Sequence, residues 1–229
     1  MKKLYWAVYA AVLLCVIGTA VFLIVAPDRV PMHYNFAGEA DRVGSKYENL
    51  LYPLFAAGLG AFFLVLAKFQ GKKGETGNEK ILVLAGVCVV GFFTLLGFRF
   101  MWRALRYDPE SARNVSYGDI NRFVSIGLGV LLAVLGNVMP KAKRNSLFGL
   151  RTKWSMANDD VWQKSQRFAG IASVLAGLTL IVLSPFVPGM WNILMMSAVV
   201  LVLSAVCAAA SRRYCLEDRA ARENGAKDR

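Results

Sequence analysis

The chain has 229 residues, of which 56% are hydrophobic and only 18% are charged, which is typical of a protein embedded in a bilayer rather than of a soluble domain. Its formal net charge of +12 at pH 7 raises nucleic acid as a possible partner. The polar segments between the apolar runs, however, are too short to fold into the basic surface that a nucleic-acid binder needs. We therefore expect anionic lipids to balance the charge, with no direct contact to nucleic acid.

The N-terminal apolar run resembles a signal peptide, because Lys2 and Lys3 precede it. This run, residues 4–26, is longer than the usual apolar region of about 7–15 residues, and no small-x-small cleavage site precedes Pro27. We expect a retained first transmembrane helix, with cleavage as the alternative.

A spanning helix needs about 20 mainly apolar residues, and the uncharged runs of the chain supply six such segments. The run 168–211 is too long for one span, and Pro185, Pro188 and Gly189 can turn it back on itself. Glycines such as Gly127 and Gly129 are expected to allow close helix packing. The sequence predicts an all-α, polytopic membrane protein with a single membrane domain. The expected helices of this six-transmembrane-helix bundle cover about 4–26, 49–69, 81–102, 123–140, 160–184 and 190–211.

Lys and Arg are distributed unevenly between the segments that connect these spans. Most of the 27 lie at the two ends of the chain, around residues 68–80 and in a central loop at 141–159. Because Lys and Arg favour the cytoplasmic side, this pattern predicts cytoplasmic termini, a cytoplasmic central loop and an outer motif loop at 27–48.

The end of the third span and the segment after it depart from this bias. Their arginines are Arg99, Arg103, Arg106, Arg113 and Arg122. The first three share a face if the helix continues, where they can snorkel, pair with outer acids, hold lipid phosphates or receive an acidic ligand. The sequence leaves these roles open. The order Asp108, Pro109, Glu110 also predicts a short outer helix.

The outer loop contains the only histidine, His33, which can titrate near physiological pH. Turn-stabilising hydrogen bonds are an alternative role for His33, Asn35 and Asp41. The loop offers no Cys and no second His, so no metal site or cofactor is expected. No charged residue falls within the apolar runs, and no nucleophile motif accompanies His33, which argues against a pump and against an enzyme.

The central loop combines helix-start signals with an unusual polar pattern. Asn158 is placed as the N-cap of the fifth helix, and Trp154 and Trp162 suit a membrane boundary. The order N-x-x-x-G-x-R, formed by Asn145, Gly149 and Arg151, fits either a structural staple or a docking site.

Two motifs carry a resemblance to a known family. Residues 136–162 read G-N-x-x-P-K-x-K-x-N-x-x-x-G-x-R-T-x-W-x-x-x-N-x-x-V-W, and residues 31–46 read P-x-H-x-N-x-x-G-x-x-D-x-x-x-S-K. Together they resemble the SdpI family of bacterial membrane immunity proteins. The chain departs from the family pattern at Lys153, where proline is frequent, and at Ser155, where threonine is frequent.

The resemblance implies a multi-pass protein of the bacterial cytoplasmic membrane that confers resistance to a secreted peptide toxin and signals by sequestering a cytoplasmic transcriptional repressor. It implies an extracytoplasmic binding site formed by His33, Asn35, Gly38, Asp41 and Lys46. The implied cytoplasmic partner-binding residues are Asn137, Asn145, Gly149, Arg151, Trp154, Asn158 and Trp162. Two alternatives stay open: a small transporter or membrane enzyme whose outer loop binds a substrate, and an accessory subunit of a larger complex.

Overall fold

The computed structural model of the protein describes residues 2–34, 40–72, 76–107 and 118–227. Within these ranges, six helices are long and apolar enough to cross a membrane, which confirms the predicted fold class. They are α1 (Lys2–Val25), α2 (Leu51–Lys72), α3 (Thr76–Leu105), α4 (Gly118–Val138), α5 (Asp159–Leu183) and α6 (Gly189–Lys227).

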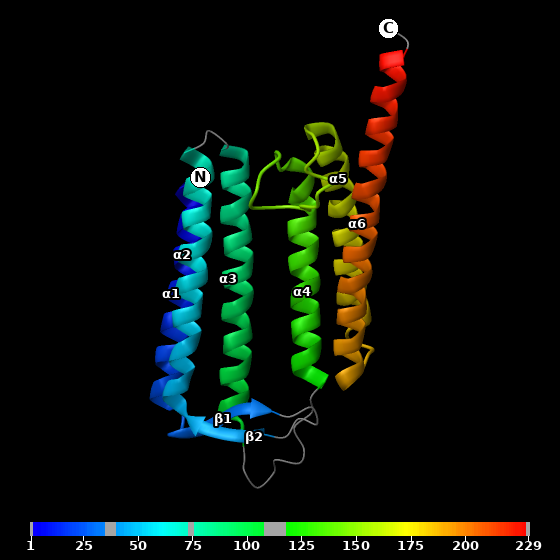
Figure 1. Cartoon of the computed structure of the whole chain (residues 1–229). Coiled ribbons are helices and arrows are strands. Elements are labelled where there is room, and N and C mark those ends of the chain that lie inside the picture. Colours follow the sequence, from blue (N-terminus) through cyan, green and yellow to red (C-terminus); the bar gives the residue numbers. More distant parts are fainter. Residues whose placement is uncertain (1, 35–39, 73–75, 108–117, 228–229) are drawn as a thin grey trace.

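The six helices form two groups of three. The helices α1, α2 and α3 pack on one another, α4, α5 and α6 form the second group, and α3 and α4 make a less extensive contact between the groups (Figure 1). The two ends of the chain and the loop between α4 and α5 lie at the same end of the bundle, which we call the termini face. The opposite end carries a β-hairpin and is called the hairpin face.

Glycines set the close approach of α4 and α5. A Cβ atom added to Gly136 would lie 2.7 Å from the carbonyl oxygen of Gly170, and one added to Gly170 would lie 2.6 Å from the carbonyl oxygen of Gly136. Gly129 and Gly177 approach each other's carbonyl oxygens in the same reciprocal way farther along both helices. Because only hydrogen atoms fit between the backbones here, the expected packing role of Gly129 is confirmed.

The loop after α1 contains a β-hairpin, an addition to the purely helical prediction. The strands β1 (Arg29–Tyr34) and β2 (Ala40–Ser45) pair antiparallel, with Arg29 opposite Ser45 and an irregularity after Pro31. Val30 is buried against Phe22 of α1 and Met101 of α3. The hairpin is therefore held at the bundle end by the buried Val30 of its first strand.

The chain leaves the hairpin through a capped 3-10 turn, Lys46–Leu50, that leads into α2. The hydroxyl of Ser45 accepts a hydrogen bond from the Tyr47 amide, and the carboxylate of Glu48 accepts one from the Ser45 amide. This reciprocal cap fixes the direction in which the chain enters the membrane.

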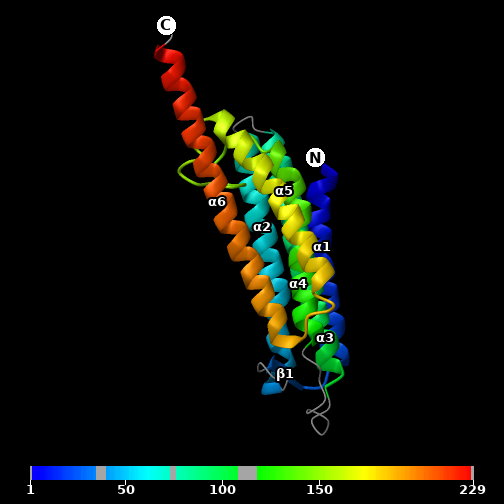
Figure 2. The same ribbon diagram turned by 90° about the vertical axis from the view of Figure 1, so that its right-hand side faces the viewer.

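The helix α6 continues beyond the predicted span end at residue 211 and projects past the other helices (Figure 2). Ion pairs one helical turn apart support this extension, since Arg213 lies 2.7 Å from Glu217 and Arg222 lies 2.9 Å from Asp218. The short helix predicted from Asp108 onward lies outside the described residues, as does Arg113.

Candidate functional site

The first turn of the central loop is built around the Asn145 side chain. Its carbonyl oxygen accepts hydrogen bonds from the backbone amides of Leu147 and Phe148, both at 2.8 Å, and its NH₂ group donates to the carbonyl of Lys143 at 2.7 Å. The residue is only 7% exposed. Asn145 therefore acts as a staple for the loop rather than as part of the surface.

Gly149 and Gln166 form the second staple. Gly149 has φ of 103°, in the left-handed region that favours glycine, and its α-carbon faces the Gln166 amide. The fully buried Gln166 side chain accepts from the Leu150 amide and donates to the Leu150 carbonyl, both at 2.9 Å. The sequence patterns did not indicate Gln166, because a single amide on an apolar helix carries no spacing signal.

A compact turn follows at the position of the family departures. The buried Ser155 hydroxyl donates to the Leu150 carbonyl at 2.7 Å and accepts from the Thr152 amide at 2.9 Å. A threonine hydroxyl can make the same bonds, so serine here preserves the turn. The Thr152 hydroxyl lies 2.9 Å from that of Ser211, which ties the turn to α6. Trp154 is half-buried, and the ammonium group of Lys153 lies 5.1 Å from its ring centre.

The predicted helix start at Asn158 is confirmed. Its side-chain oxygen accepts from the Val161 amide at 2.9 Å, while its NH₂ group donates to Asp218 of α6 at 2.8 Å. Trp162 is 2% exposed, and its indole N–H donates to the carbonyl of Ala142 at 2.8 Å. The two residues fasten α5 to α6 and to the central loop, respectively.

The central loop also joins the two groups of helices at the termini face. The backbone amide of Lys143 donates at 3.0 Å to the side-chain oxygen of Asn78, which is buried near the start of α3. Leu147 and Phe148 pack against the apolar cluster of α1, α2 and α3. This bridging role, and the part of Asn78 in it, were not visible in the sequence, because the partners are far apart in the chain.

The predicted cytoplasmic partner-binding set is divided between buried and exposed residues. Asn137 and Arg151 are exposed, and the Arg151 guanidinium donates to the Ser146 carbonyl. The central loop and the start of α5 also enclose a polar cavity of about 670 Å³, which neither of these two residues lines. Its lining residues are Pro140, Lys141, Ala142, Lys143, Arg144, Asp159, Trp162 and Gln163. Arg144 forms a 2.7 Å ion pair with Asp159, so Lys141 and Lys143 supply the remaining positive charge of the cavity.

The hairpin brings together two of the predicted outer residues. The ring nitrogen Nδ1 of His33 lies 2.6 Å from a carboxylate oxygen of Asp41, and both side chains are exposed. Lys46 instead points to the base of the hairpin, where it is 13% exposed, donates to the Ala26 carbonyl at 3.1 Å and pairs with Asp28 at 3.2 Å. Asn35 and Gly38 lie outside the described residues.

Two members of the arginine cluster stack on aromatic rings at the hairpin face. The Arg103 guanidinium is buried and lies 4.4 Å from the ring centre of Tyr34 in β1. The Arg106 guanidinium lies 4.4 Å from the ring centre of Trp102. Arg103 therefore helps to hold the hairpin on α3, which gives one of the arginines in this region a structural role.

Two groups of helices that can span a membrane, joined by an ordered loop at one end and carrying a hairpin at the other, define the chain as a multi-pass membrane protein. Residues 141–210 match the SdpI/YfhL protein family, and residues 10–57 match a domain of unknown function, DUF1648. The immunity protein SdpI of Bacillus subtilis (strain 168) is 36% identical over 188 residues, which cover 82% of this chain and 84% of that protein. The chain belongs to the SdpI family. The comparison with solved structures gives no match.

Proposed function

We propose that this chain is a membrane immunity protein that protects its cell from a secreted toxic peptide. The observation that supports this most strongly is its 36% identity to an immunity protein over most of both chains. The arrangement agrees with it, because each group of helices presents one ordered motif: the hairpin at one end and the central loop at the other.

The termini face is assigned to the cytoplasm in this proposal. The described basic residues of the segments at that end include Lys2, Lys3, Lys68, Lys72, Lys80, Lys141, Lys143, Arg144, Arg151, Lys153, Arg212, Arg213, Arg219, Arg222 and Lys227. Their number agrees with the preference of Lys and Arg for the cytoplasmic side. The hairpin then faces outward, where the exposed His33 and Asp41 pair is the proposed contact for the toxin.

The signalling role is proposed for the polar cavity at the termini face. Its exposed cations, Lys141 and Lys143, suit an acidic surface on a cytoplasmic repressor, whereas Asn145 and Trp162 are buried and would act by shaping the loop. For toxin binding to change this surface, the toxin must prefer one arrangement of the two helix groups. A change in the arrangement of the two groups would alter the conformation of the central loop, because the loop contacts both of them.

A survival assay tests the proposal. A toxin-sensitive bacterium that expresses the chain should survive a challenge with a secreted toxic peptide. His33→Ala and Asp41→Ala should each reduce protection, and the double variant should lose little more, because the two side chains act as a pair. Arg29→Gln, an exposed change on the same strand, is the matched control. Wild-type protein that reaches the membrane and gives no protection would refute the immunity role.

The same strains test signalling with a second measurement. A fluorescently tagged candidate repressor should move to the membrane when toxin is added to cells with wild-type protein. Lys143→Glu should leave it in the cytoplasm while survival is unchanged, since the exposed ammonium group is not needed for the fold. Recruitment that is unaffected by Lys143→Glu would place the partner surface elsewhere.

A further inference from the structure

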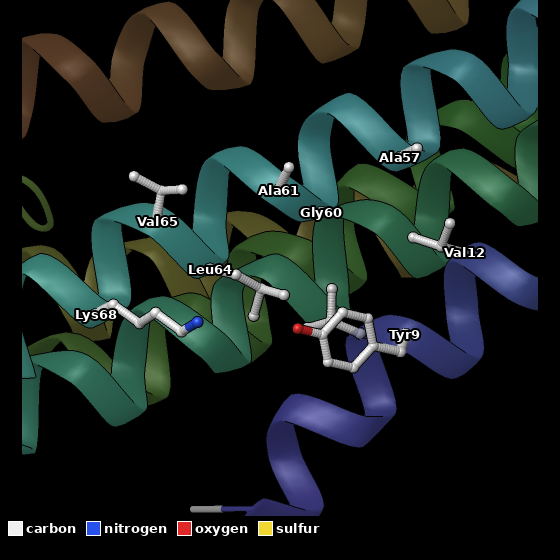
Figure 3. A pocket seen from close by; sticks show the side chains of 9 residues that line it. Tyr9, Val12, Ala57, Gly60, Ala61, Leu64, Val65 and Lys68 are labelled. Atoms are coloured by element: carbon white, nitrogen blue, oxygen red, sulfur yellow. The ribbon is translucent and has the colours of Figure 1, made fainter.

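A groove runs between α1 and α2 on the outer surface of the bundle and has a volume of about 340 Å³ (Figure 3). Its lining residues are Val8, Tyr9, Val12, Ala57, Gly60, Ala61, Leu64, Val65 and Lys68. On the α2 side, the small residues Ala57, Gly60 and Ala61 leave the space that forms the groove. At Gly60, an added Cβ atom would already lie 3.1 Å from Val12, so a larger side chain there would fill the space.

The length of the groove matches one leaflet of a bilayer. From Ala57 to Lys68 it follows α2 for roughly 16 Å, at about 1.5 Å per residue. The hydrocarbon core of a bilayer is about 30 Å thick, so one leaflet accounts for about 15 Å. Lys68 lies four residues before the end of α2 at the termini face, and Ala57 lies near the middle of the candidate span Lys46–Lys72. The groove thus begins at a membrane surface and ends near the midplane.

The polar groups of the groove gather at its surface end. The ammonium group of Lys68 and the hydroxyl of Tyr9 point toward one another across Leu64 (Figure 3). The described lining residues include no acid, so the end of the groove is positively charged. Trp6, which is exposed, packs edge-on against Tyr9 with ring centres 5.9 Å apart, as is typical of aromatic residues at a membrane interface.

We propose that this groove is a binding site for one anionic phospholipid of the leaflet at the termini face. One acyl chain lies along Leu64, Gly60 and Ala57, and the head-group phosphate accepts hydrogen bonds from Lys68 and Tyr9. The cation at the surface end favours an anionic over a zwitterionic head group, and the apolar remainder fits a chain of one leaflet's length. This site does not depend on the proposed immunity function.

Native mass spectrometry of the full chain in mild detergent tests the site. The protein is titrated with phosphatidylglycerol or with phosphatidylcholine of the same acyl chains, and the bound lipids are counted. The first equivalent of phosphatidylglycerol should bind more tightly than that of phosphatidylcholine. Lys68→Gln should weaken the binding of phosphatidylglycerol about fivefold and leave that of phosphatidylcholine unchanged. Lys72→Gln, an exposed change one turn later on the same helix, should alter neither.

Filling the groove provides the second arm. Ala61→Leu adds bulk at an exposed lining position and should remove the first bound equivalent of both lipids without disturbing the contact of α1 with α2. Equal binding of the two lipids, equal effects of Lys68→Gln and Lys72→Gln, or undiminished binding to Ala61→Leu would each overturn the proposal. A further outcome would also overturn the proposal: the wild-type protein forms lipid-free dimers, and Ala61→Leu dissociates them. A second copy of the chain would then occupy the groove in place of a lipid.

Discussion

At the scale of single residues, buried amides replace secondary structure in the central loop. Asn145 and Gln166 together satisfy the backbone amides of Leu147, Phe148 and Leu150, which have no helix or strand to bond them. Buried backbone groups without partners are costly, so these side chains fix one conformation of the loop. Of the predicted partner-binding residues, Asn145 and Trp162 are thus buried supports of the loop, whereas Asn137 and Arg151 are exposed.

Gln166→Ala should destabilise the protein because it removes both hydrogen bonds to Leu150. Each buried group left without a partner costs about 1–3 kcal/mol, which should lower the melting temperature in detergent by several degrees. Gln163→Ala, at an exposed position of the same helix, is the control and should melt like the wild type. Equal melting of the two variants would show that Gln166 does not support the loop.

At the scale of the helices, the close contact between α4 and α5 has no tolerance for added atoms. Gly136→Ala would place a methyl group 2.7 Å from a backbone oxygen, so the helices must separate, at an expected cost of about 1–3 kcal/mol. Gly58→Ala is a matched control, because nothing lies within 4 Å of the added atom there. Thermal unfolding of both variants in detergent should show a loss of stability for Gly136→Ala alone. A stable Gly136→Ala protein would mean that the two helices are not held this close.

The helices also show what the sequence could and could not predict. The spanning helices follow directly from uncharged runs, because burial in lipid demands an apolar segment of a set length. The extension of α6 was missed because beyond Ser211 the helix is held by ion pairs instead of by lipid. The hairpin was missed because only Val30 and Pro31 of β1 are buried. Two consecutive buried residues do not give the alternating apolar pattern that identifies a strand in a sequence.

The site could be predicted only in part. Asn158 was recognised as a cap since its partner lies three residues away, and such local pairs leave a pattern in the sequence. Asn78 and Gln166 were not recognised, because their partners come from other elements of the fold. The sequence predicted the same role for Asn145 and Arg151, because both belong to one motif. In the structure Asn145 is buried and Arg151 is exposed. Burial depends on the packing of the whole loop, which no motif specifies.

At the scale of the whole molecule, both ends of the chain lie on one side of the bundle, and the basic segments predict that this side is cytoplasmic. A membrane-impermeant maleimide should therefore label Val43→Cys in intact cells and label Arg219→Cys only after permeabilisation. Both positions are exposed, on the hairpin and on the α6 extension. Wild-type protein, whose cysteines are three buried and one half-buried, gives the background. Labelling of Arg219→Cys in intact cells would reverse the orientation and the proposed roles of the two loops.

The bridge made by the central loop has a consequence for biogenesis. Since the chain is synthesised from its N-terminus, α1, α2 and α3 enter the membrane before Leu147 and Phe148 have been made. Until then, the apolar cluster that includes Val8, Leu64 and Val83 lacks the cover that these two side chains provide. The first three helices must therefore remain in the membrane for a time with this cluster partly uncovered. Once the loop has been made, Leu147 and Phe148 cover the apolar cluster, and the hydrogen bond from Lys143 to Asn78 joins the first three helices to the second group.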